Sequence, residues 1–203
     1  MPAADHGYHV LARARLPKGT VELARYLIGK IVVREMSRSL LSGRIVETEA
    51  YPLGDAAGHA YRGETPRTQA LFLERGRAYV YLAYGTSYML NVSSEVAGVV
   101  AGVLIRALEP LTGIAAMQRN RGIQKLRDLA RGPGRLAAAF GIDRRLDGSD
   151  LCREGPLWLA RDNCNAPEIE TGTRIGLSRE AHRLLRFYVR GNPFVSGPKS
   201  LNL

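Results

Sequence analysis

Two glutamates, Glu47 and Glu49, stand two residues apart in the segment from Gly43 to Tyr51 and are the first candidates for chemistry. Ile45 and Val46 favour a strand here. Residues two apart on a strand share a face, so both carboxylates would point the same way, roughly 7 Å apart at about 3.3 Å per residue. This pair indicates either acid–base chemistry or a sheet edge with its polar face in water, and the segment alone leaves both open.

Arg106 lies in the apolar segment from Gly102 to Pro110, which predicts another strong strand. A buried guanidinium without a partner is costly, so it needs an acid or carbonyl groups nearby. Glu47 or Glu49 is the natural partner. The alternative is that Arg106 emerges into water at the end of the strand.

Three tyrosines mark the clearest predicted hairpin, whose strands are Ala78 to Ala83 and Ser87 to Ser93. Tyr79 and Tyr81 would share one face, and Tyr84 would sit at the turn. Core packing explains an aromatic residue at an exposed turn poorly. Tyr84 is therefore a candidate wedge between stacked bases, or equally an anchor for a protein partner.

The only imidazole near these segments is His59, in a glycine-rich loop from Pro52 to Glu64. A loop of this length is usually functional or mobile, although a lone histidine is more often a surface residue than a catalytic one. Thr65-Pro66-Arg67 then provides a cap and a proline at the first helical position, which predicts a short helix through Leu73.

A second glycine-rich stretch, Gly132-Pro133-Gly134-Arg135, precedes the predicted helix from Leu136 to Phe140. Backbone N–H groups and a positive helix dipole at such a start can face a phosphate. Gly134 and Arg135 are therefore predicted to bind phosphate. The stretch does not match the phosphate-binding loop of nucleotide triphosphatases, so that activity is not expected.

The remaining periodic segments must position these residues, and they mix helix and strand patterns. The strand from Lys30 to Met36 is expected to pair antiparallel with the strand from Arg44 to Tyr51. The other predicted elements are helices over 21 to 28, Pro110 to Arg121 and Ile123 to Arg131, and strands over Leu157 to Ala160, Thr173 to Leu177 and Leu185 to Arg190.

The composition is that of a globular, strongly basic chain. It has 203 residues, of which 45% are hydrophobic, and 29 basic against 19 acidic side chains give a net charge of +10. The sequence pI is about 10.1 and the mean hydropathy is -0.14. One domain over residues 1–203 is expected, with an arm at 1–18 and a tail at 197–203. The charge indicates an anionic partner, with nucleic acid the first candidate.

The cysteines and the hydropathy of the chain indicate its cellular compartment. Cys152 and Cys164 fit neither a disulfide framework nor a zinc spacing, so free thiols in a reducing compartment are expected. The first residues do not resemble a signal peptide, and the longest apolar run, Ala97 to Ile105, is too short to cross a bilayer. The predicted location is the cytoplasm, or the nucleus if the source has one.

Several blocks in order along the chain resemble the alkyladenine (3-methyladenine) DNA glycosylase family. The resemblance implies an α+β fold, a single mixed domain around a curved antiparallel sheet with surrounding helices, and not a helix-hairpin-helix architecture. It also implies a monofunctional glycosylase that leaves an abasic site. The blocks are Arg44-Ile45-Val46-Glu47-Thr48-Glu49-Ala50-Tyr51, Thr65-Pro66-Arg67, Tyr79-Val80-Tyr81-Leu82-Ala83-Tyr84-Gly85, Asn91-Val92-Ser93-Ser94, Arg106-Ala107-Leu108-Glu109-Pro110 and Arg186-Phe187-Tyr188-Val189-Arg190-Gly191.

The resemblance implies that Glu49 activates the hydrolytic water. Arg106, His59 and the main-chain carbonyl of Val195 would help to hold that water. Glu47 has no implied role, and a structural hydrogen bond is its simplest explanation.

The same resemblance implies how a base would be bound. Tyr51, His59 and Tyr81 would stack on an extruded purine, Asn91 would border the pocket and disfavour the exocyclic amine of guanine, and Tyr84 would fill the gap in the duplex. The stretch from residue 52 to 58 is one residue shorter than is usual in the family.

Further implications concern partners. Double-stranded DNA containing damaged purines is the expected substrate of a monomer that needs no cofactor, no metal and no membrane. The short N-terminus favours a bacterial source, in which the protein would associate with the nucleoid.

Two competing hypotheses remain. Glu47 and Glu49 could form a glycoside hydrolase pair, because their spacing is near the lower end of the roughly 6.5 to 9.5 Å of inverting enzymes. Two acids on one face of one strand rarely flank a sugar from opposite sides, however. The chain could also be a non-catalytic nucleic-acid-binding protein with tyrosines as stacking platforms. Only that last hypothesis predicts that Glu49→Gln changes no activity.

Overall fold

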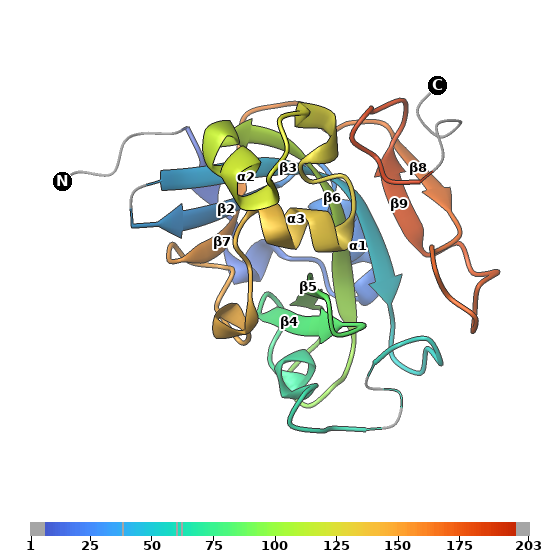
Figure 1. Ribbon diagram of the computed structural model, residues 1–203. Helices are drawn as coiled ribbons and strands as arrows, with labels where there is room; N and C mark the ends of the chain where they lie inside the picture. Colours follow the sequence, from blue (N-terminus) through green and yellow to red (C-terminus); the bar gives the residue numbers. More distant parts are fainter. Residues whose placement is uncertain (1–6, 38, 60, 62, 198–203) are drawn as a thin grey trace.

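A strongly curled antiparallel sheet dominates the computed structural model, which describes residues 7–37, 39–59, 61 and 63–197 (Figure 1). The strands follow the order β1-β7-β2-β3-β6-β5-β4, and β9 pairs with both β3 and β8. Their bounds are β1 His9–Val10, β2 Ile31–Met36, β3 Ser39–Tyr51, β4 Ala78–Ala83, β5 Ser87–Ser93, β6 Gly102–Thr112, β7 Leu157–Arg161, β8 Ile169–Gly172 and β9 Arg186–Val189.

Strand β3 is the longest and has different neighbours along its two halves. It pairs with β6 on one side, and on the other side with β2 over Ser39–Arg44 and then with β9 over Glu47–Glu49. The β3–β6 register shifts where Val46 on β3 and Arg106 on β6 are skipped. Such an irregularity bends a strand and redirects its side chains, and it falls next to Glu47.

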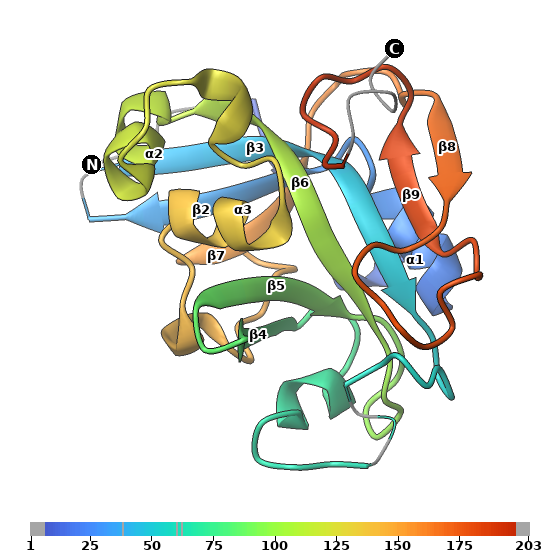
Figure 2. The ribbon, with the colours of Figure 1, turned by 45° about the vertical axis from the view of Figure 1, so that its right-hand side comes forward.

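Three α-helices accompany the sheet: α1 Thr20–Leu27, α2 Ile114–Arg121 and α3 Pro133–Ala139. Helix α1 packs on β3 and β6, whereas α2 and α3 pack on each other and α3 also covers β5 and β6 (Figure 2). Short 3-10 turns occur at Arg13–Arg15, Gln69–Phe72, Leu126–Asp128 and Arg144–Leu146. No helix in the described ranges combines the length and apolar character needed to cross a bilayer.

The main core is built by alternation along the strands. On β6, Val103 and Ile105 join the main hydrophobic cluster with Phe140 of the α3 end and Leu23 of α1. Successive strand residues point to opposite faces, so Leu104 and Arg106 face the other side, where they line a cavity. The sheet thus separates a hydrophobic core from a functional face, as one α+β domain.

The predicted α+β class with a curved antiparallel sheet is confirmed, as is the antiparallel pairing of β2 with β3. The hairpin strands end at the predicted residues. The predicted first and last elements are also present, as α1 and β9. Of the predicted arm and tail, residues 1–6 and 198–203 lie outside the described residues, while β1 of the arm pairs with β7.

Three predicted helices differ from the structure. Residues 123–131 form only the turn Leu126–Asp128, because the segment then extends and Arg131 bridges to Ala107 of β6. The predicted helix over Pro110 to Arg121 begins only at Ile114, because β6 continues to Thr112. The predicted helix through Leu73 is a 3-10 turn at Gln69–Phe72.

The predicted strand over Thr173 to Leu177 is wrong. Residues 169–172 form β8 instead and occupy the edge of β9, where Glu170 pairs with Tyr188. The residues that follow leave the sheet, and the Arg174 side chain is buried against Asp55. Residues 173–177 have a sequence pattern that favours a strand, but the edge of β9 is already paired with β8.

Candidate active site

Glu47 is a fully buried carboxylate enclosed by hydrogen-bond donors. Its Oε1 accepts from Arg106 Nε at 3.0 Å, Arg186 Nε at 2.6 Å and Ser196 Oγ at 2.9 Å, and its Oε2 accepts from Ser196 N at 2.7 Å. Burial alone would raise the pKa of Glu47, but Arg106 and Arg186 outweigh it and the pKa is lowered. Glu47 therefore stays ionised and fastens β3 to β6, β9 and the segment at Ser196.

Glu49 is equally buried but has a different environment. Its Oε1 accepts from the backbone N–H of Ile175 at 2.7 Å and forms an ion pair with Arg106 Nη1 at 3.1 Å. Its Oε2 accepts from the Tyr51 hydroxyl at 2.9 Å. Ile175, Arg106 and Tyr51 all line the same cavity. Glu49 thus lies directly behind the cavity wall, and all three of its donors belong to that wall.

Arg106 connects the two glutamates, because it contacts Glu47 through Nε and Glu49 through Nη1. Burial alone would lower its pKa, but the charges of Glu49 and Glu47 outweigh it and raise the pKa. Arg106 is therefore a fixed cation at the cavity. The sequence left open whether its partner was Glu47 or Glu49, or water, and the structure pairs it with both carboxylates.

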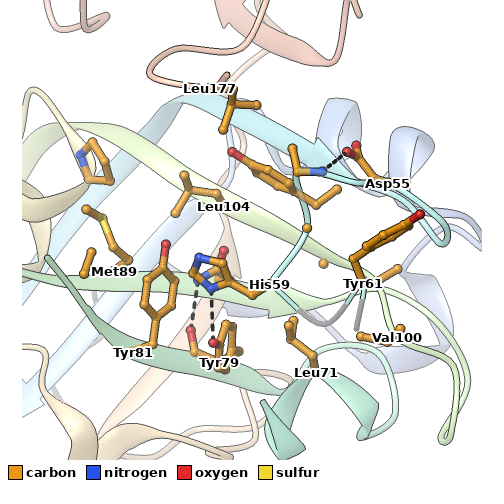
Figure 3. Close-up of a pocket in the computed structure, with 18 of the residues that line it drawn as sticks. Asp55, His59, Tyr61, Leu71, Tyr79, Tyr81, Met89, Val100, Leu104 and Leu177 are labelled. Carbon is orange, nitrogen blue, oxygen red and sulfur yellow. Dashed lines mark hydrogen bonds between the residues drawn. The ribbon is translucent and has the colours of Figure 1, made fainter. Parts of the chain in front are cut away.

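The cavity has a volume of about 510 Å³ and opens on the functional face of the sheet. Figure 3 shows Leu177 on one side and Tyr81 and His59 on the other. A cavity of several hundred cubic ångströms with mostly apolar walls and a few polar groups is typical of a small-molecule or base site. Among its lining residues are Tyr51, His59, Tyr81, Asn91 and Arg106, all five predicted from the sequence, and also Tyr79, which was not.

The aromatic wall is formed by three rings in contact. The His59 ring meets the Tyr81 ring edge-on with centroids 4.1 Å apart, and Tyr79 stacks on Tyr81 at 5.2 Å. His59 Nδ1 and the Tyr79 hydroxyl are 3.3 Å apart. Burial and then the nearby Arg67 lower the pKa of His59, so its ring is neutral at neutral pH. Burial raises the pKa of Tyr79 to about 12.

Asn91 lies on β5 opposite Tyr79 of β4, and its side-chain amide donates to the Tyr79 carbonyl at 3.2 Å. This hydrogen bond fixes the orientation of the amide at the cavity wall. Its position at the border of the cavity agrees with the sequence-based expectation, whereas discrimination against guanine stays a prediction.

Tyr84 projects from the β4–β5 turn at the rim of the cavity. Its side chain is 90% exposed, and its backbone φ is 51°, a conformation that bulky residues rarely adopt. Gly85, the next residue, also has a positive φ of 70°, which gives the tight turn favoured in hairpins. The turn thus holds a large aromatic ring in solvent at some backbone strain, a combination associated with functional sites.

The opposite wall is formed by residues 175–177, which sequence analysis had placed in a strand. Arg174 is buried with its guanidinium 4.6 Å above the Tyr51 ring. It also pairs with Asp55. The sequence did not reveal Asp55, Arg174 or Ile175 as site residues, because contacts across more than a hundred residues leave no local pattern.

Three predicted site residues lie away from the cavity wall. Val195 is buried against Val46, and its carbonyl accepts from Arg131 Nε at 2.8 Å. Gly134 approaches the hairpin so closely that a Cβ would lie 2.9 Å from the Ser87 Cβ, which explains a glycine there without a ligand. The side chain of Arg135 is half exposed, with Nη1 3.8 Å from Asp128. Their roles in binding water and phosphate stay predictions.

The donor set does not suggest a metal centre. Within the described ranges, no group of three or more His, Cys, Asp or Glu side chains is arranged to hold a metal ion. The described carboxylates of the site are paired with guanidinium groups instead. A buried carboxylate behind an aromatic cavity is suited to binding a flat heterocycle and to acid–base chemistry beside it.

Comparison with known proteins identifies the family. Residues 14–193 match the family described as methylpurine-DNA glycosylase, and the chain belongs to that family. The family resemblance predicted from the sequence is thus confirmed. The chain is a hydrolase of the DNA glycosylase class that acts on alkylated purines.

Relatives from distant organisms are similar over nearly the whole chain. A protein of Mesorhizobium japonicum is 70% identical over 94% of this chain and 92% of its own length. One of Paraburkholderia phytofirmans is 52% identical, covering 94% and 90%. One of Methanoculleus marisnigri is 41% identical, covering 92% and 98%. The names of all three place them among the 3-methyladenine DNA glycosylases.

Proposed function

We propose that this chain is a monomeric, monofunctional glycosylase that extrudes an alkylated or deaminated purine from double-stranded DNA and hydrolyses its N-glycosidic bond with a water activated by Glu49. The observation that carries this proposal is the position of Glu49. It is a buried carboxylate whose three hydrogen-bonding or ion-pair partners, Tyr51, Arg106 and Ile175, all line the cavity.

Glu49 keeps acceptor capacity for a water. A carboxylate offers about four lone-pair sites, and among the described residues Oε1 has two partners while Oε2 accepts only from Tyr51. In the proposed step, a water bound to Oε2 adds to the sugar C1′ as the bond from C1′ to the base nitrogen breaks and its electron pair leaves with the base. A cationic alkylpurine thereby leaves as a neutral base, and a neutral deaminated purine takes up a proton from solvent as it leaves. The carboxylate takes the proton of the water and also stabilises the positive charge that develops on the sugar.

The ring-lined cavity would hold the extruded base. A base within a duplex cannot be reached, so it must rotate out at a cost of a few kcal/mol. Tyr51, Tyr81 and His59 offer ring faces or edges on which a purine can stack, and a cationic alkylated purine gains further from aromatic faces. A neutral His59 adds no charge that would repel such a cation. The aromatic walls do not require a cation, so neutral deaminated purines are included in the proposal.

Tyr84 would occupy the space that the base leaves. Its exposed ring stands at the tip of a rigid two-stranded hairpin next to the cavity. Inserted side chains offset part of the cost of unstacking. The net charge of +10 favours association with the phosphate backbone.

Two features support hydrolysis by water over the alternatives. No lysine lines the cavity among the described residues, so no amine is placed there to form a covalent Schiff base and cleave the strand. Glu47 is enclosed by Arg106, Arg186 and Ser196, which argues against its serving as the second acid of a glycoside hydrolase pair.

The test is base release from duplexes carrying one hypoxanthine, one ethenoadenine or no lesion, and from methylated genomic DNA. Wild type should release damaged bases and leave the undamaged duplex intact. Glu49→Gln should bind the lesion duplexes but release no base. Release by Glu49→Gln at the wild-type rate would overturn the proposal, and duplex binding without any release by wild type would favour a binding protein.

A further inference from the structure

Residues 175–177 form one wall of the cavity, and the segment 174–177 belongs to no strand of the sheet. Ile175 donates its backbone N–H to Glu49, and Leu177 faces the cavity across from Tyr81 and His59 (Figure 3). The wall and the position of the Glu49 carboxylate are therefore set by the same short segment. What fixes this segment determines the geometry of the site.

A buried ion pair between Arg174 and Asp55 fixes it, and the partly exposed Arg183 Nη1 lies 3.5 Å from the same Asp55 Oδ2. Arg174 Nη1 lies 2.5 Å from Asp55 Oδ2 and Nη2 lies 3.1 Å from Oδ1, so the guanidinium meets the carboxylate through two hydrogen bonds. Nη1 also donates to the carbonyl of Ala50 at 3.0 Å. Both side chains are completely buried. Because Asp55 follows β3 closely in sequence, this pair joins the end of β3 to the far wall.

The same guanidinium also backs one ring of the cavity. Its carbon lies 4.6 Å from the centroid of the Tyr51 ring. The Tyr51 hydroxyl in turn donates to Glu49 Oε2. Arg174 therefore reaches the carboxylate by two routes, through the Ile175 amide to Oε1 and through the Tyr51 ring to Oε2.

Stability alone explains this arrangement poorly. Burying two charges carries a desolvation penalty that their attraction offsets only with very good geometry, and an apolar replacement is often as stable. Among the described residues, Arg174 Nε has no hydrogen-bond partner although it is buried, which adds to the penalty. A pair that is expensive to bury but highly directional is suited to fixing geometry.

We propose that Arg174 and Asp55 are positioning residues. They hold the segment 174–177 against β3 and so keep Glu49 and Tyr51 in their reactive arrangement. This inference rests on the proposed role of Glu49. Without this ion pair, the wall would move off β3, Glu49 would lose its Ile175 donor, and Tyr51 would lose the cation behind its ring. Neither residue would need to touch the substrate.

The test uses Arg174→Met and Asp55→Asn in the full chain. Each variant is first shown to be folded by circular dichroism. Single-turnover base release is then measured on a hypoxanthine duplex with enzyme in excess, and affinity is measured on a duplex with a tetrahydrofuran abasic analogue, which has no base to enter the cavity. We expect the release rate to fall by about 10-fold to 100-fold, since small misplacements at a reacting centre cost that much. Affinity for the abasic analogue should change less than about twofold.

The chain contains a closely matched control on the other half of β3. Arg44 makes two hydrogen bonds to Asp162, at 2.7 and 3.2 Å, and a third to the carbonyl of Gly29 at 3.0 Å. This repeats the bonding pattern of Arg174, although the Arg44–Asp162 pair is partly exposed. Neither Asp162 nor Gly29 lines the cavity, whereas Asp55 does. Arg44→Met should lower the unfolding midpoint and leave the release rate of the folded protein unchanged.

Two more variants separate positioning from general stability. Arg174→Lys keeps the charge but cannot make two parallel hydrogen bonds, so its release rate should lie between those of wild type and Arg174→Met. The double variant Asp55→Asn with Arg174→Met should be no slower than the slower single variant, because the two residues act as one unit.

Wild-type release rates in folded Arg174→Met and Asp55→Asn would overturn the inference, as would rate losses that multiply in the double variant. An equal rate loss in Arg44→Met would show that any lost ion pair slows the enzyme, and would overturn it as well. These outcomes are distinct from failure of the proposed function, which is decided by Glu49→Gln alone. If Glu49→Gln is inactive but Arg174→Met keeps the wild-type rate, the proposed function stands and only the positioning role of Arg174 and Asp55 is wrong.

Discussion

Glu47 and Glu49 offer a comparison within one strand, because they are the same residue on the same stretch of β3 and both are completely buried. The Glu47 region is closed: two guanidinium groups, a backbone amide and a hydroxyl surround its carboxylate. The Glu49 carboxylate lies behind the wall of a cavity, to which all three of its partners belong, and we call this cavity, with Tyr84 at its rim, the open region.

With Glu49 as the proposed catalytic residue, burial and charge do not by themselves define a catalytic carboxylate. Both glutamates contact Arg106, so the cation does not distinguish them either. What differs is whether the carboxylate's remaining acceptor positions are filled by the protein or directed to a cavity. On this account, Glu47 maintains the fold and holds Arg106, and Glu49 performs the chemistry.

The largest stability effect is expected at the closed region. Glu47→Gln removes the anion between two buried guanidinium groups, and breaking a buried pair from one side costs about 3 to 5 kcal/mol. Urea denaturation should show this loss. A matched control is Glu170→Gln, whose exposed partner is Arg190, directly after β9, and its unfolding midpoint should barely change. Equal midpoints for the two variants would remove the distinction between closed and exposed carboxylates.

A substitution in the open region should change DNA affinity and leave the free energy of unfolding unchanged. Tyr84→Ala removes a ring that is 90% exposed, so the unfolding midpoint should not fall. Affinity for a lesion in a duplex should fall by roughly tenfold, because stacking of an aromatic side chain on a base contributes about 1 to 3 kcal/mol. Affinity for the same lesion in a single strand, where the base is already accessible, should change much less. Equal losses for both substrates would contradict the wedge role.

The smallest effect concerns pH. Burial and then Arg67 lower the pKa of His59 below its ordinary value of about 6.5. The unfolded chain therefore takes up this proton before the folded chain does, and the contribution of His59 to stability falls as pH drops below about 6.5. Titration of His59 should therefore not change the rate of base release between about pH 7 and pH 8.

An NMR titration of the His59 ring measures this directly, and His59→Gln should remove the corresponding part of the acid-side stability loss. A midpoint for His59 at or above about 6.5 would mean that the open region does not keep its imidazole neutral. Such a result would weaken the contrast between a closed region full of charge and an open region walled by neutral rings.

Local pattern was sufficient to predict much of the strand framework, whereas the cavity residues Tyr51, His59, Tyr81 and Asn91 were expected from the family resemblance. The alternation around Glu47 and Glu49 and the turn at Tyr84 depend on near neighbours in sequence, and the structure has the strand and hairpin that they predict. The cost of a buried, unpaired guanidinium indicated Glu47 or Glu49 as the partner of Arg106, with water as the alternative, and the structure pairs it with both glutamates.

Contacts between distant segments could not be predicted in this way. The Asp55–Arg174 pair spans 119 residues, and Arg186 reaches Glu47 across 139. Thr173 to Leu177 has the composition of a strand, but the edge of β9 is already paired with β8. Which segment pairs with a sheet edge, and which side chains meet in the core, depends on competition between distant segments. The periodic pattern of one segment carries no information about that competition. The same limit explains why the sequence indicated only a structural hydrogen bond for Glu47 without its partners, although Glu47 accepts more hydrogen bonds than Glu49.

The measurement that tests the central claim most directly compares Glu47→Gln with Glu49→Gln for both unfolding in urea and single-turnover release of hypoxanthine from a duplex. The account predicts opposite profiles. Glu47→Gln should be strongly destabilised, yet its folded fraction should release the base within about tenfold of the wild-type rate. Glu49→Gln should lose less stability than Glu47→Gln, because Glu49 pairs with Arg106 alone whereas Glu47 pairs with both Arg106 and Arg186, and it should bind the duplex and release no base. Base release by Glu49→Gln, or its loss in a stable Glu47→Gln, would contradict the account.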